Sequence, residues 1–113
     1  MQKITLFRME TLSKVGAFQT LPITDNIISI FQDLPESTYL NLPNIKYGTL
    51  SKEDLLLWFP YESILYLMEH NIYLTTYKLP ISDIYKIDQY QVLYTDRNLE
   101  PVRIECPSTL YSY

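Results

Sequence analysis

A proline interrupts the longest helical pattern of this chain and divides it in two. Pro60 stands between residues 51–59 and 61–70, and proline is not tolerated inside a helix. Ser51, followed three residues later by Asp54, resembles a capping box and predicts the start of the first helix. We expect the second helix to end at a cap, Asn71, and to bury one apolar stripe, made of Tyr61, Ile64, Leu65 and Met68.

The N-terminal segment, residues 2–9, has the composition of a strand. It carries apolar side chains on both faces, which favours a central place in a sheet. Arg8 lies near its end and shares one face with apolar neighbours such as Leu6. A charge in that position needs a cleft or a partner, for which Glu10 and Glu105 are the candidates.

The segments on either side of the helical region differ in character. Between the first strand and residue 46 we expect a loop, a short helix capped by Thr24, and a second loop with an extended piece around Tyr39; these cover residues 10–22, 25–34 and 35–46. The last third alternates apolar and polar residues and predicts strands at 72–78, 90–95 and 101–106. Turn-forming residues 96–98 favour a hairpin between the last two, and 80–88 fits either a short helix or a loop.

This order of elements indicates an α+β fold in one domain, residues 1–113. We expect a small, mainly antiparallel sheet of four to five strands packed with two to three helices. No apolar run is long enough for a bilayer, and Lys3 and Arg8 interrupt the N-terminus, so we expect neither a membrane protein nor a signal peptide. Together with a single cysteine, these features favour a cytoplasmic protein, in the host cell if the chain is phage-encoded.

The net charge and the few residues that could carry out catalysis or bind a metal argue against several classes of function. The net charge is −4 without a basic stripe, so we expect no direct binding of nucleic acid. His70 and Cys106 are the only residues of their kinds, which argues against a zinc site and against a histidine-based catalytic triad. The two glycines are 32 positions apart and form no phosphate-binding loop. We expect His70 to interact with the last carbonyls of its helix.

Five short motifs follow one another between residues 4 and 95. They are Arg8-Met9-Glu10, Gly16-Ala17-Phe18, Gly48-Thr49-Leu50-Ser51, Trp58-Phe59 and Gln91-Val92. This layout resembles a family of small phage and prophage proteins, and the resemblance implies an anti-CRISPR or another anti-defence protein. Trp58 and Phe59 are themselves expected to be ordinary core residues, because large aromatic side chains dominate cores.

The same layout is distantly similar to the ADP-ribosyltransferase fold. That resemblance implies a phosphate of NAD at Arg8, a nicotinamide pocket supported by Thr49 and Ser51, and a late catalytic motif at Gln89 and Gln91. Such enzymes need a carboxylate in the late motif to stabilise the ribose cation, and an amide carries no charge. The resemblance therefore favours the fold and a cleft over the activity.

Residues 24–69 hold seven acidic residues against two lysines, a local balance of −5, and the chain has eleven tyrosines. Our leading hypothesis is a non-enzymatic inhibitor that blocks a host or bacterial defence protein, such as a CRISPR effector, through an acidic, tyrosine-rich surface. The expected partner-binding residues are Asp33, Glu36, Glu53, Asp54, Tyr61 and Glu62. The alternatives are a minimal ADP-ribosyltransferase or nucleotide-binding relic using NAD, and an accessory phage structural protein that forms a homodimer or larger oligomer. Under the leading hypothesis no cofactor is expected.

Overall fold

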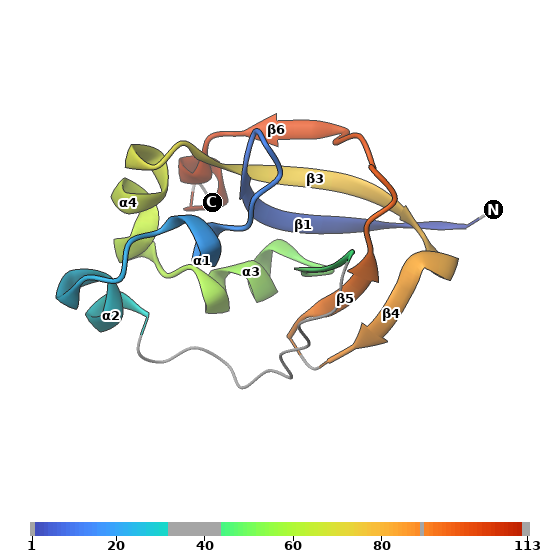
Figure 1. The fold of residues 1–113 in the computed structure, drawn as a ribbon, viewed down its shortest axis with the longest axis horizontal. Helices are drawn as coiled ribbons and strands as arrows, with labels where there is room; N and C mark the ends of the chain where they lie inside the picture. Colours follow the sequence, from blue (N-terminus) through green and yellow to red (C-terminus); the bar gives the residue numbers. More distant parts are fainter. Residues whose placement is uncertain (1, 32–43, 89, 112–113) are drawn as a thin grey trace.

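The computed structural model describes residues 2–31, 44–88 and 90–111, which form an α+β fold (Figure 1). Its strands make two three-stranded antiparallel sheets. The first sheet has the order β1-β3-β6 and contains Lys3–Thr11, Ile72–Pro80 and Arg103–Glu105. The second has the order β2-β5-β4 and contains Ile45–Gly48, Val92–Thr95 and Ile84–Ile87. The expected single sheet of four to five strands is thus divided in two.

Three expectations about the strands were wrong. β1 lies at the edge of its sheet, and β3 is the central strand. The expected hairpin between the last two strands is absent, since β5 pairs with β2 and β4 whereas β6 pairs with β3. The turn chemistry itself is present: Asp96 accepts a hydrogen bond from the backbone N–H of Asn98, whose φ is 57°. It redirects the chain from one sheet to the other. β2 and β4 fall in segments where no strand was assigned.

Short helices connect the strands, and their ends follow the sequence signals. They are α1 (Ala17–Thr20), α2 (Asp25–Ile30), α3 (Lys52–Trp58), η1 (Tyr61–Ser63), α4 (Ile64–Glu69), η2 (Ile81–Asp83) and η3 (Pro107–Tyr111). Thr24 and Ser51 accept hydrogen bonds from the backbone N–H groups of Ile27 and Asp54, at 3.3 and 3.1 Å. Both predicted caps are therefore confirmed. α1 lies in the segment expected to be a loop, and Tyr39 lies outside the described residues.

The predicted break at Pro60 is also confirmed, because α3 ends just before it and η1 begins just after it. Asn71 has the left-handed conformation of a helix cap, with φ 55°. The ring nitrogen Nδ1 of His70 lies 2.8 Å from the Tyr66 carbonyl, as expected for a histidine at a helix end. Tyr111 in η3 donates its hydroxyl to the Phe59 carbonyl at 2.6 Å and so ties the last described turn to this junction.

The buried stripe predicted for the second helix was wrong at three of its four residues, and the fourth, Ile64, is half-buried. Tyr61, Leu65 and Met68 are 68%, 65% and 46% exposed, whereas Leu67 and Ser63 are buried. The reason is the 3₁₀ turn η1 before α4. A 3₁₀ helix has about 3.0 residues per turn, whereas an α-helix has about 3.6. A 3₁₀ turn directly before α4 therefore changes which residues of the segment face the core.

Two apolar clusters occupy opposite faces and opposite ends of the first sheet. From β1, Leu6 packs with Tyr77, Val92 and Tyr94 between the two sheets, while Met9 packs with the cluster under α3 and α4. Figure 1 shows β4 and β5 near one end of β1 and β3, and α4 near the other. A reciprocal pair of backbone hydrogen bonds, both 2.8 Å, joins Phe7 to Thr49 and fixes β2 against β1.

Candidate functional site

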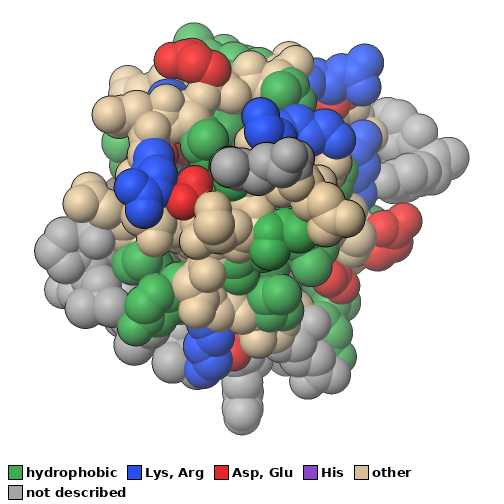
Figure 2. Space-filling model, turned by 90° about the vertical axis from the view of Figure 1, so that its right-hand side faces the viewer, with side chains coloured by type: hydrophobic (Ala, Val, Ile, Leu, Met, Phe, Trp, Pro, Cys, Tyr) green, Lys and Arg blue, Asp and Glu red, His purple; other side chains and the backbone are tan. Residues whose placement is uncertain are grey.

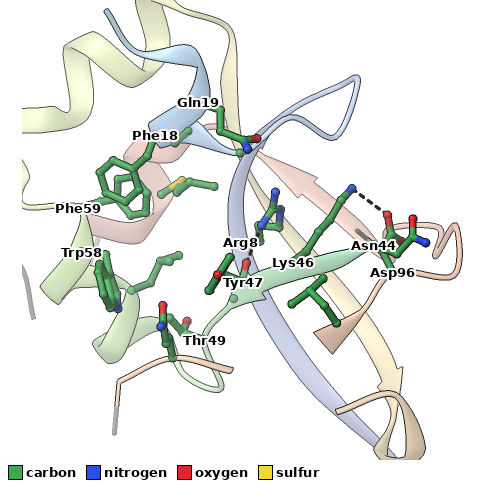
Figure 3. A pocket seen from close by; sticks show the side chains of 17 residues that line it. Arg8, Phe18, Gln19, Asn44, Lys46, Tyr47, Thr49, Trp58, Phe59 and Asp96 are labelled. Carbon is green, nitrogen blue, oxygen red and sulfur yellow. Dashed lines mark hydrogen bonds and ion pairs between the residues drawn. The ribbon is translucent and has the colours of Figure 1, made fainter. Parts of the chain in front are cut away.

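A cleft of about 570 Å³ opens where β1, α1, β2 and α3 meet (Figure 3). Three of the residues singled out by the sequence, Arg8, Thr49 and Gln91, line it. The Trp-Phe pair lines it as well, which makes the end of α3 one of its walls. The other lining residues are Met9, Gly16, Ala17, Phe18, Gln19, Asn44, Ile45, Lys46, Tyr47, Gly48, Leu55 and Asp96.

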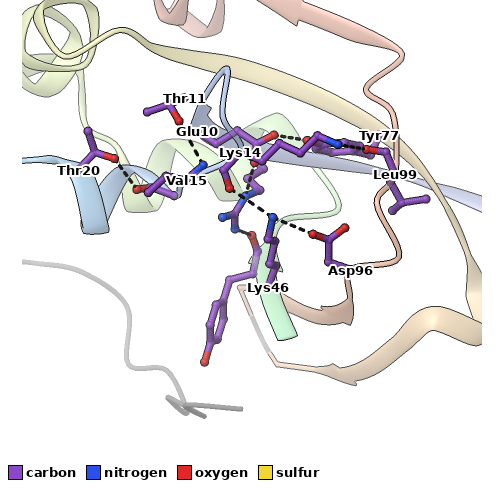
Figure 4. A network of polar contacts seen from close by, with 12 residues as sticks. Glu10, Thr11, Lys14, Val15, Thr20, Lys46, Tyr77, Asp96 and Leu99 are labelled. Atoms are coloured by element: carbon purple, nitrogen blue, oxygen red, sulfur yellow. Dashed lines mark hydrogen bonds and ion pairs between the residues drawn. The ribbon is translucent and has the colours of Figure 1, made fainter. Parts of the chain in front are cut away.

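Arg8 is the buried cation of the cleft, and the structure supplies the carboxylate expected for it. Its Nε donates to Glu10 at 2.7 Å, and its Nη1 donates to the Tyr47 carbonyl at 2.7 Å. Tyr77 donates its hydroxyl to the other oxygen of Glu10 (Figure 4). Burial and the bond to the Glu10 carboxylate raise the pKa of Tyr77 well above its ordinary value, so this hydroxyl stays protonated.

Both glycines of the chain line this cleft, each for a steric reason. A Cβ at Gly48 would lie 2.8 Å from Cγ of Leu6 and 2.9 Å from the Phe7 carbonyl oxygen. Gly48 is therefore what lets β2 approach β1 closely. A Cβ at Gly16 would lie 3.0 Å from Nη2 of Arg8, so Gly16 keeps the space beside the guanidinium open.

A second ion pair borders the polar side of the cleft. Nζ of Lys46 lies 2.8 Å from Asp96 and also donates to the Lys14 carbonyl at 3.3 Å, while Lys14 donates to the Leu99 carbonyl (Figure 4). Burial alone would raise the pKa of Asp96, but the hydrogen bond and charge of Lys46, with backbone donors, hold it below its ordinary value. Lys46 and Asp96 were not among the predicted site residues, because Lys46 was assigned to a loop and Asp96 to a turn.

The opposite side of the cleft is aromatic. The rings of Phe18 and Phe59 stack with centroids 5.0 Å apart at an interplanar angle of 15°. Trp58 donates its indole N–H to the Tyr90 carbonyl at 2.9 Å, which fixes its ring orientation. Phe59 is buried, as expected of a core residue, whereas Trp58 is half-buried and part of its surface faces the cleft.

The structure brings together only some of the residues that the ADP-ribosyltransferase alternative assigns to catalysis. Thr49 donates its hydroxyl to the Ser51 carbonyl, and Ser51 caps α3 without belonging to the cleft lining. Gln91 is buried and its amide lies 3.4 Å from the Asp88 carboxylate, while Gln89 lies outside the described residues. Asp96 is the one acid among the lining residues that are described, and it is bound to Lys46.

Those of the expected partner-binding residues that the structure describes do not line the cleft. Glu53, Glu62 and Tyr61 are exposed and Asp54 is half-buried, whereas Asp33 and Glu36 are outside the described residues. Tyr61 lies edge-on against Tyr111, with centroids 5.6 Å apart. Five exposed residues lie along η1 and α4, and together they are called here the η1–α4 surface. They are Tyr61, Glu62, Leu65, Met68 and Glu69.

A different exposed apolar group lies at the end of the molecule that contains β4. Ile81, Tyr85 and Ile87 are all exposed there. Figure 2 views this end and shows hydrophobic side chains among charged ones of both signs. Its acids are neutralised by neighbours: Lys86 lies 3.4 Å from Asp88, and Arg97 lies 2.8 Å from Asp83. Among the described residues, Glu62 and Glu69 have no such cationic neighbour within ion-pair distance.

Comparisons of the chain with known proteins gave no match. No protein-family model, no characterised protein and no solved structure gave a significant match to the chain. The resemblances to phage proteins and to ADP-ribosyltransferases stay predictions. In the described part of the chain, no helix has the length and apolar character needed to cross a membrane. The same residues contain no group of three or more His, Cys, Asp or Glu side chains placed to hold a metal ion.

Proposed function

We propose that this protein is a non-enzymatic binding protein that occupies and blocks a partner protein through the η1–α4 surface. One observation carries the proposal: an apolar stripe with helical spacing, Tyr61, Leu65 and Met68, is left on the outside of the fold. Such a stripe is the pattern with which an amphipathic helix enters a groove of another protein. Tyrosine is also among the residues that contribute most to interface affinity.

The charges around this stripe define the chemistry of the partner. Residues 51–70 contain four acids and one lysine, a net charge of −3 with His70 neutral. The one lysine, Lys52, lies over the ring of Phe7 at 5.8 Å from its centroid. A partner with an apolar groove bordered by Lys and Arg side chains would match both features, and opposite charges would speed the encounter. The resemblance to phage proteins makes a defence protein of the host, such as a CRISPR effector, the first class to examine.

Two substitutions at matched positions test the surface. Leu65→Asp places a charge in the middle of the η1–α4 surface, and Ile87→Asp does the same in the apolar group near β4, where the side chain is 58% exposed. Wild type and both variants are used as bait in a host lysate, and each captured protein is then purified and titrated against all three. We expect Leu65→Asp to lose binding and Ile87→Asp to keep it. Binding that survives Leu65→Asp, or that depends equally on Ile87, contradicts the proposal.

A further inference from the structure

The cleft has two chemically different sides, and we infer that it binds a small aromatic carboxylate. Figure 3 shows Phe18, Phe59 and Trp58 on one side and Arg8 and Lys46 on the other. Its volume of about 570 Å³ lies within the usual range of small-molecule sites, roughly 300 to 1,000 Å³. The inference is independent of the proposed partner surface, because the residues of the η1–α4 surface do not line the cleft.

Arg8 supplies the anchor for the carboxylate. Nε and Nη1 are already used by Glu10 and by the Tyr47 carbonyl, and these two bonds fix the plane of the guanidinium. Within the described residues, Nη2 makes no hydrogen bond, and it is the atom nearest to the open space at Gly16. A guanidinium that is buried, fixed and has a free N–H is a preorganised donor for a carboxylate oxygen. The side-chain amide of Gln19 lies on the same side with its Oε1 toward this space, and rotation of the amide by 180° would present its N–H₂ to a carboxylate.

The charge of the lining favours a ligand with a single negative charge. Arg8, Lys46 and Asp96 are its charged members, which gives a net charge of +1. The Glu10 carboxylate lies outside the lining but is bound to Arg8, so the two ion pairs Arg8–Glu10 and Lys46–Asp96 together carry no net charge. A carboxylate therefore adds one negative charge to the site, whereas a phosphate dianion adds two beside Asp96.

The aromatic side selects the rest of the ligand. Phe18 and Phe59 are stacked on each other, and the indole of Trp58 is fixed by its bond to the Tyr90 carbonyl, so these rings form a rigid apolar wall. Met9 and Leu55 continue the wall toward the interior. A flat ring packed against it buries apolar surface and gains ring–ring contacts.

Titration of the full chain by ¹H–¹⁵N NMR tests the site. Trp58 is the only tryptophan, so its indole N–H gives one unambiguous resonance in the cleft. Benzoate, phenylacetate and indole-3-acetate are the probes, and phenylacetamide and AMP are the comparison ligands. We expect at least one acid to shift the Trp58 indole and the Arg8 Nε–H resonances, with the amide and the nucleotide binding at least about tenfold more weakly. The inference is overturned if no acid moves these resonances at about 10 mM, or if the amide or AMP binds as tightly.

Gly16→Ala tests the anchor while keeping both members of the ion pair, Arg8 and Glu10, in the chain. Gly16 has φ −62° and ψ 152°, which alanine adopts without strain, yet the new Cβ would stand 3.0 Å from Nη2 of Arg8. We expect this variant to fold and to bind the acid at least about tenfold more weakly. Ser13→Ala, an exposed substitution in the same turn, is the control and should bind like wild type. Unchanged affinity in Gly16→Ala would show that Arg8 is not the anchor.

Discussion

Arg8 and Glu10 lie on the same face of β1 and form a buried ion pair, with 2.7 Å between Nε and Oε2. Residues two apart on a strand share a face, so the sequence alone places these two side chains together. Tyr77 on β3 completes the group by donating to the second carboxylate oxygen. Glu10 is the centre of the group, because it accepts from both Arg8 and Tyr77, so a change at any of the three residues removes a partner of Glu10 or Glu10 itself.

Removing the cation should cost more than removing both charges. Arg8→Ala leaves the Glu10 carboxylate buried beside Tyr77 without a counter-charge, and we expect the free energy of unfolding to fall by about 3 to 5 kcal/mol. The double variant Arg8→Met/Glu10→Met removes the unpaired charge and should recover a large part of that loss. Urea denaturation of wild type and both variants measures the difference. A double variant less stable than Arg8→Ala would contradict this account of the pair.

Alkaline pH should destabilise the fold through Tyr77. Its folded-state pKa lies above the ordinary value of 10.0, so the stabilisation is fully present below pH 10 and is lost as the pH rises further, when the unfolded chain ionises first. Tyr77→Phe should lower stability at pH 7 by about 2 kcal/mol, through the lost bond to Glu10. It should also flatten the alkaline decline. Urea midpoints between pH 7 and pH 11 give both effects, and Tyr85→Phe, at an exposed position, is the control.

The N-terminal cap of α3 should contribute a measurable share of stability. Ser51→Ala removes the acceptor for the Asp54 backbone N–H, at a cost of about 1 kcal/mol. Because Ser51 does not line the cleft, binding of an aromatic acid or of a partner should change little. Thermal denaturation together with the binding titrations checks this. Ser82→Ala, at an exposed serine, should leave the melting temperature unchanged. Strong loss of binding with an unchanged melting temperature would give Ser51 a role beyond the cap.

The two glycines should respond differently to the same substitution. In Gly48→Ala the new methyl meets the Phe7 carbonyl oxygen at 2.9 Å, and backbone must move, so we expect a loss of about 1 to 3 kcal/mol. In Gly16→Ala the nearest atom belongs to a side chain at 3.0 Å, and the loss should be smaller. Denaturant midpoints of the two variants give the comparison directly. Equal losses would mean that the contact between β2 and β1 is less tight than the structure shows.

Reversing the acids of the helical region should weaken partner binding and reduce its dependence on salt. The triple variant changes Glu53, Asp54 and Glu62 to lysine. Attraction between unlike charges is screened at about 10 Å in 0.1 M salt, so the effect should be largest at low ionic strength. Affinity for the captured partner, measured at several salt concentrations, tests this. An affinity equal to that of wild type would exclude the acidic residues from the interface.

Local signals in the sequence predicted several local features correctly. Ser51 and Thr24 cap their helices, Pro60 separates α3 from η1, and Glu10, one of the two candidate partners, pairs with Arg8. Each of these features depends on residues within a few positions of one another, so it can be recognised in the sequence without knowledge of the fold. The α+β class followed from the order of such elements.

Long-range pairing explains what could not be predicted. β2 and β4 have four residues each, too few for a periodic signal, and they become strands because β5 supplies hydrogen bonds on both sides. The cleft depends on the same pairing, since β2 brings Lys46 and Tyr47 next to β1. The exposed stripe on α4 depends on a 3₁₀ turn that the sequence does not distinguish from a regular helical turn.

The hydrogen bond from the Tyr111 hydroxyl to the Phe59 carbonyl limits how early the fold can be completed during synthesis. It joins residues 52 positions apart, and Tyr111 belongs to the last described turn. On the ribosome, the junction between α3 and η1 emerges long before the hydroxyl that fastens it has been translated. The η1–α4 surface on a nascent chain therefore lacks this hydrogen bond until residue 111 has been translated and has left the ribosome.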